Sequence, residues 1–95
     1  MATTDQILSS VTLGRGLSIR ASVQAFDSGE WVRVIVAADH PCYARDAWRA
    51  ARKAQRALRA AGWASVKRPI DYRFTYSEWS QIPMGAVASF HARAA

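Results

Sequence analysis

The side chains with the clearest chemical potential are the basic residues of the segment from residue 44 to residue 62. They recur every three or four positions, as Arg45, Arg49, Arg52, Lys53, Arg56 and Arg59. On a helix this spacing gathers them within about a third of the circumference. Arginine presents a planar fork of N–H donors that matches the oxygens of phosphates and carboxylates. The chemistry that these residues predict is the binding of an anion.

Such a concentration of like charge costs stability unless a partner neutralises it. Cations three or four positions apart on a helix repel by about 0.2–0.5 kcal/mol per pair, and Asp46 is the only acid in the segment. The plain alternative is a solvated helix in a protein whose genome composition favours arginine. We favour the functional interpretation, in which nucleic-acid phosphates or an acidic protein surface lie along the basic residues.

Side chains suited to catalysis are few. Asp39, His40 and Cys42 lie together at the expected start of the long helix, where a histidine could assist a thiol nucleophile, but the same residues fit an ordinary helix start with a small buried cysteine. Asp71 and Glu78 form no recognisable acid–base pair. Two histidines and one cysteine are too few for a structural zinc site, which takes four ligands. We expect no catalytic residues, no metal, no cofactor and no enzymatic activity.

Length and composition predict one small globular domain spanning residues 1–95. Hydrophobic residues make up 51% of the chain and the net charge is +6, with eleven arginines among the thirteen basic residues. Cys42 is the single cysteine, which favours a reducing compartment. Neither a membrane-spanning run nor a signal peptide is expected. These features favour the cytoplasm of a bacterium or of a phage-infected cell.

Two strands joined by a tight turn are expected before the long helix. Residues 17–26 alternate between apolar and polar types, Asp27-Ser28-Gly29 suits a turn, and residues 31–38 return. The apolar side chains should share the core face: Leu17, Ile19, Ala21, Val23, Ala25, Val32, Val34 and Val36. The opposite face should hold Arg20, Trp31, Arg33 and Ile35.

Helix signals lie on both sides of this hairpin. Thr3 and Gln6 fit a capping box for a short helix over residues 3–11. The long helix should start at Asp39-His40-Pro41 and end at Gly62, after which Trp63 should contact Leu58. Its sheet-facing side should carry small residues and one leucine, with Trp48 at the border: Ala47, Ala51, Ala54, Leu58 and Ala61.

The chain after the helix predicts further strands. A third strand is expected within residues 64–79, where Tyr72, Phe74 and Tyr76 alternate with polar residues and Pro69 suggests a sheet edge. Residues 85–93 are a weaker candidate for a fourth, since alanine and glycine are poor strand formers. The predicted fold class is α+β: a small antiparallel sheet of three or four strands, one long amphipathic helix on one face and a short N-terminal helix, in the order α-β-β-α-β-(β).

Other basic residues could extend the anion-binding surface. They are Arg15, Arg20, Arg33, Lys67, Arg68 and Arg73. Gly14-Arg15-Gly16 is either a plain turn, which we favour, or a backbone cradle for an anion. Arg20, Arg33 and Arg73 could share an open sheet face with Trp31, as on surfaces that stack single strands. For Trp31, beside a turn, we favour ordinary packing over stacking of this kind.

Two functional hypotheses follow. The first is a small, non-enzymatic binding module whose arginine-rich helix contacts the nucleic-acid backbone with weak sequence specificity. The second is a phage-encoded inhibitor of a bacterial defence system, which docks on an acidic protein or ribonucleoprotein surface. In its compact size and lack of catalytic motifs the chain looks like the anti-CRISPR class, which has no shared motif. An assembly protein of a phage or mobile element is a third option, and both a monomer and a homodimer fit.

Overall fold

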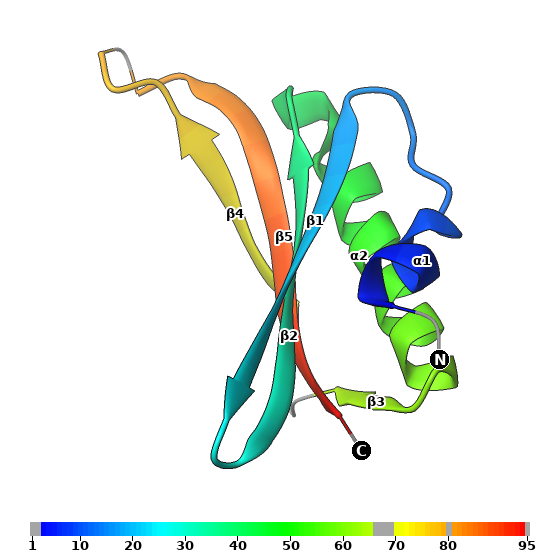
Figure 1. Ribbon diagram of the computed structural model, residues 1–95. Helices are drawn as coiled ribbons and strands as arrows, with labels where there is room; N and C mark the ends of the chain where they lie inside the picture. Colours follow the sequence, from blue (N-terminus) through cyan, green and yellow to red (C-terminus); the bar gives the residue numbers. More distant parts are fainter. Residues whose placement is uncertain (1–2, 66–69, 80, 95) are drawn as a thin grey trace.

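The computed structural model describes residues 3–65, 70–79 and 81–94. Helices and strands follow one another in these residues as shown in Figure 1. Their bounds are Thr4–Ser9 for α1, Leu17–Phe26 for β1, Gly29–Ala38 for β2, Pro41–Tyr43 for the 3-10 turn η1, Ala44–Ala60 for α2, Trp63–Ser65 for β3, Asp71–Tyr76 for β4 and Pro83–Ala94 for β5. The predicted α+β class is confirmed, with α2 packed on one face of an antiparallel sheet.

The sheet is antiparallel and has β2 and β5 in its middle. β1 pairs with β2, β2 pairs with β5, and both β3 and β4 pair with β5. β4 lies beside residues 83–89 of β5 and β3 lies beside residues 92–94, so the two short strands follow each other along one edge of β5. The described residues therefore form five strands rather than three or four, because the 12-residue β5 is long enough to hold two short partners.

Of the two strands expected after the helix, the first differs from its prediction and the second is confirmed. The single strand expected over residues 64–79 is divided into β3 and β4, and Pro69 lies outside the described residues. The weaker candidate over residues 85–93 is confirmed as β5, the longest strand, in the middle of the sheet. Ala86, Ala88 and Ala92 of β5 are buried under α2, so close packing outweighs their low strand propensity.

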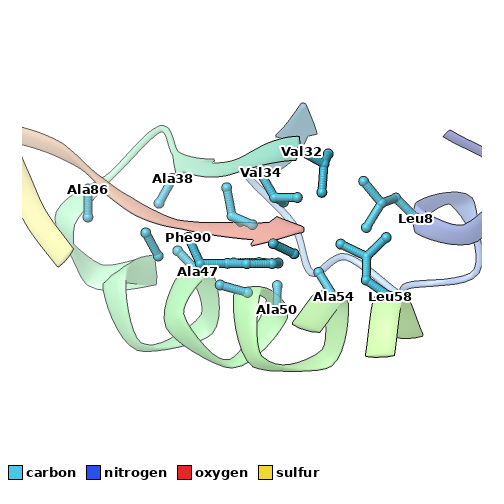
Figure 2. Packing of buried hydrophobic residues seen from close by; sticks show 14 of the residues in the cluster. Leu8, Val32, Val34, Ala38, Ala47, Ala50, Ala54, Leu58, Ala86 and Phe90 are labelled. Carbon is cyan, nitrogen blue, oxygen red and sulfur yellow. The ribbon is translucent and has the colours of Figure 1, made fainter. Parts of the chain in front are cut away.

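The core lies between α2 and the two middle strands (Figure 2). Alternate residues of β2 and β5 are buried on the helix side: Val32, Val34, Val36, Ala38, Ala86, Ala88, Phe90 and Ala92. The alanines of α2 allow the helix to lie close to the sheet, as interiors packed to crystal-like density require. Leu8 of α1 closes one end of the core beside Leu58 and Val32.

The β1–β2 hairpin confirms most of its predictions. Its turn lies at Asp27-Ser28, and Gly29 has the positive φ, 121°, that glycine tolerates best. Val32, Val34 and Val36 are fully buried, as predicted. In the far half of β1, Val23 pairs with the buried Val32 and shares its face, but Val23 is 46% exposed and Ala25 is exposed too. β1 is an edge strand, and α2 lies over β2 and β5 instead.

The helix ends follow local sequence. Thr3 and Gln6 form the predicted capping box, with Gln6 N–H donating to Thr3 Oγ1 at 3.2 Å. His40 caps the start of the long helix through Nδ1, which accepts from Cys42 N–H at 3.1 Å, and the first turn is the 3-10 turn η1. Gly62, with φ of 100°, ends α2, and Trp63 packs on the core cluster that includes Leu58.

The buried face of α2 differs from the prediction at two positions. Ala61 is exposed and lies just after the last residue of the helix, Ala60. Ala50 is buried in its place. Trp48 lies at the border as predicted but is 43% exposed. Leu58 and the sheet residue Phe90 therefore supply the largest buried side chains between helix and sheet.

Candidate functional site

The side of α2 turned away from the sheet carries the basic residues singled out in the sequence. Ala47, Ala51 and Ala54 bury the opposite side against the core. We call the exposed basic row the arginine stripe; its members, all exposed, are Arg45, Arg49, Arg52, Lys53, Arg56 and Arg59. At a rise of 1.5 Å per residue, the stripe runs for about 21 Å along the helix.

Most of the stripe has no carboxylate partner within the described part of the chain. This holds for Arg45, Arg49, Arg52, Lys53 and Arg56. Asp46, the one acid on α2, stands in the first turn, where it suits the helix dipole. The guanidinium of Arg52 lies 5.5 Å from the ring centroid of Trp48, a cation–π contact that leaves its charge in place. The stripe is therefore a strongly positive ridge open to solvent.

An open groove adjoins the N-terminal end of the stripe. It has a volume of about 490 Å³ and is lined by Pro41, Cys42, Ala44, Arg45, Trp48 and Tyr72. Tyr72 reaches it from β4, because its partner in the register is the buried Ala88 of β5 and paired residues lie on the same face. We call this feature the Trp48–Tyr72 groove. No sequence pattern predicted it, since it depends on how β4 pairs with β5.

The face of the sheet away from α2 forms a second basic surface, which we call the open sheet face. The register places Arg20 opposite Ile35 and Arg33 opposite Ser22, with Trp31 two positions before Arg33 in β2. Arg20, Arg33, Trp31 and Ile35 thus share one face, as predicted. Arg73 lies on it too, opposite Val87, and forms a salt bridge with Asp71 at 3.8 Å.

Sequence reasoning missed one arginine of the open sheet face. Arg93 of β5 pairs with Trp31, and its guanidinium lies 5.9 Å from the Trp31 ring centroid. His91 pairs with Arg33 on the same face. Alternate residues of a strand share one face, and Val87, Ser89 and His91 alternate in β5. The next residue in this series is Arg93, so the sequence could have placed it on the open sheet face. Trp31 also donates from Nε1 to Ser28 Oγ at 3.1 Å, which ties its ring to the turn.

Of the remaining secondary contacts, Arg15 is the one that the structure describes. Arg15 is exposed in a turn with Gly16, as the favoured interpretation predicted. In that turn Leu17 N–H donates to Gly14 O at 3.4 Å, and Gly16 O accepts from Asp39 N–H at 3.0 Å. These hydrogen bonds are those of a turn that joins the start of β1 to the end of β2. Lys67 and Arg68 lie outside the described residues.

The structure places two of the residues considered for catalysis at the start of the long helix. His40 uses Nδ1 to accept a backbone hydrogen bond at the helix start, and Cys42 is exposed rather than buried. Among the residues that the structure describes, no three His, Cys, Asp or Glu side chains come together as metal ligands. In the same residues no helix combines the length and the apolar character that crossing a membrane requires.

No protein-family model matches the chain, and comparison with curated proteins and with solved structures finds no match. The function must therefore be inferred from the surfaces themselves.

Proposed function

We propose that this chain is a small, non-enzymatic binding module whose arginine stripe lies along the phosphate backbone of a nucleic acid. The observation that carries the proposal is the combination of six exposed cations on one side of α2 with the absence of a carboxylate partner for five of them in the described residues. A polyanion would supply the missing counter-charges. The proposed place of action is the cytoplasm of a bacterium or phage-infected cell.

The charge arrangement supports a bound partner because it is unfavourable without one. Arg49, for example, has Arg45, Arg52 and Lys53 at positions three or four residues away, where like charges repel. An ordinary solvated helix places glutamates among such cations and gains stability from the pairs. Residues that lower stability while remaining exposed are better explained by binding than by folding.

The shape of the stripe favours nucleic acid over an acidic protein. Its members form a nearly straight row about 21 Å long, and duplex DNA presents one negative charge per roughly 1.7 Å of its axis. Arginine binds phosphate oxygens with two parallel N–H donors. Backbone contacts of this kind position a protein without reading bases, so the proposed binding is weakly sequence-specific.

A second candidate function is supported by a different observation. The β4–β5 hairpin exposes several large apolar side chains, namely Tyr72, Phe74, Tyr76, Trp79, Ile82 and Met84. Aromatic residues, methionine and arginine are the types enriched in protein interfaces. This surface supports an inhibitor of the anti-CRISPR kind, which would dock on an acidic protein or a ribonucleoprotein.

The two candidates are separated by direct binding to nucleic acid. Fluorescence anisotropy with a labelled duplex should show binding by the wild-type protein and a large loss of affinity on replacing Arg49, Arg52 and Arg56 with alanine.

A matched triple variant on the open sheet face serves as the control: Arg20→Ala, Arg33→Ala and Arg93→Ala. It removes the same charge from the other side of the sheet and should lose much less affinity. Equal losses would show that only net charge matters. No binding, with capture of one stoichiometric protein, would favour the inhibitor.

A further inference from the structure

We infer that the Trp48–Tyr72 groove is a stacking site for an unpaired nucleobase, in a strand whose phosphates lie on the arginine stripe. The inference rests on the proposed function and specifies its ligand: a single-stranded segment of nucleic acid. The groove and the stripe meet at Arg45, which lines the groove and is the first member of the stripe. One strand could therefore contact both surfaces at once.

Two aromatic rings from separate elements make the groove suited to a flat ligand. Trp48 comes from α2 and Tyr72 from β4, and they are 43% and 37% exposed. The remaining lining is mainly apolar, with Pro41 and Ala44 at the start of the helix. Nucleobases stack on such rings in proteins that bind single strands, and this happens with little dependence on sequence because every base has a π-face.

Each of the two rings has a neighbouring side chain beside it that restricts its motion. Phe74 lies edge-on to Tyr72, with 5.5 Å between ring centroids and an interplanar angle of 75°. The Arg52 guanidinium lies 5.5 Å from the centroid of Trp48. Rings that are fixed in advance lose less conformational entropy on binding. Arg52 also places a phosphate-binding group directly beside the indole.

Charge determines which flat ligand fits. Arg45 contributes a cation to the groove wall, and Arg49 follows one turn along α2. A base in the groove would have its 5′ and 3′ phosphates close to these guanidinium groups, whereas a neutral aromatic ligand would leave them unused. A paired base inside a duplex cannot enter, because its faces are covered by its neighbours. The groove therefore predicts a contribution to single-strand binding that duplex binding lacks.

Substitution of the two rings tests the inference. The double variant Trp48→Leu and Tyr72→Leu keeps apolar bulk but removes the stacking faces. The probes are an oligodeoxythymidylate of about ten nucleotides, within the usual site sizes for single strands, and a GC-rich duplex. We expect the affinity of the variant for the single strand to fall at least about fivefold, which is the low end of stacking contributions, with duplex affinity unchanged. Trp79→Leu, which alters a 94% exposed tryptophan outside the groove, should change neither affinity.

Cys42 provides a second measurement on the wild-type protein. It is the single cysteine of the chain, it is exposed, and it lines the groove. Saturating oligodeoxythymidylate should slow its alkylation by iodoacetamide at least threefold, while saturating duplex should leave the rate unchanged. Unchanged alkylation with bound single strand, or equal losses on both probes in the double variant, would overturn the inference.

Failure of the groove can be told apart from failure of the proposed function. If Arg49→Ala, Arg52→Ala and Arg56→Ala weaken binding to both probes while the ring substitutions weaken neither, the stripe binds nucleic acid and the groove does not. If the stripe variant binds both probes as well as the wild type does, the proposed function and the groove inference both fall.

Discussion

Replacing the centre of the arginine stripe should stabilise the protein while greatly weakening its binding to nucleic acid. The variant Arg49→Ala, Arg52→Ala and Arg56→Ala removes every like-charge pair at spacings of three or four in the stripe, because each pair includes at least one of these three residues. The pairs are 45/49, 49/52, 49/53, 52/56, 53/56 and 56/59. At about 0.2–0.5 kcal/mol each, their removal is worth about 1–3 kcal/mol before screening.

Opposing losses reduce this gain without reversing it. The variant gives up the contact between Arg52 and the half-exposed Trp48, and an exposed cation–π contact is worth about 0.5–1 kcal/mol. Alanine has a helix propensity at least equal to that of arginine. The net expectation is a gain of about 1 kcal/mol, which corresponds to a rise in Tm of roughly 4–8 °C for a domain of this size.

Thermal unfolding followed by circular dichroism checks this prediction. The gain should be largest at low ionic strength and should shrink in about 1 M salt, where the Debye length is only about 3 Å. Replacing the same three residues with lysine keeps the charges and should leave Tm nearly unchanged. A fall in Tm of the alanine variant, at low salt and with the lysine variant intact, would show that the arginines serve folding, and would refute the reasoning.

Two further predictions concern the core and the middle strand. Gly85→Ala should lower the free energy of unfolding by about 1–3 kcal/mol, because a Cβ there would meet the backbone oxygen of Ala38. Gly14→Ala is the control and should be tolerated, because the nearest atom to its Cβ is 3.8 Å away. Urea unfolding measures both variants. Phe90→Ala should lower the free energy of unfolding by about 3–5 kcal/mol, because Phe90 is only 4% exposed. Phe74→Ala should lower it by under about 1 kcal/mol, because Phe74 is 40% exposed. Equal losses in urea unfolding would contradict the assigned core.

Features that depend on local sequence were predictable. The start of η1, the turn that leads into α2, follows from His40 and Pro41. The end of α2 follows from Gly62, and the apolar period between these points fixes which side faces the sheet. The arginine stripe lies on the opposite side of the helix from those buried residues. The β1–β2 hairpin is local in the same sense, since alternation and the turn at Asp27-Ser28 set its register.

Features that depend on pairing between distant strands could not be predicted from the sequence. The position of β5 between β2 and β4 is decided by packing of its alanines against α2, which no local propensity reports. Tyr72 reaches the groove only because it pairs with Ala88, and Arg93 reaches Trp31 only through the β2–β5 register. Exposure of Val23 likewise follows from the placement of α2 over other strands.

The salt dependence of duplex binding tests the central proposal most directly. The dissociation constant should be measured from low to moderate KCl for the wild type and for the Arg49→Ala, Arg52→Ala and Arg56→Ala variant. With about five phosphate contacts, the logarithm of the association constant should fall against the logarithm of salt with a slope of roughly −4 to −5. The variant should lose about 3 units of that slope, at close to 0.9 per contact. A flat response of the wild type, or an unchanged slope in the variant, would contradict the assignment of the arginine stripe to a nucleic-acid backbone.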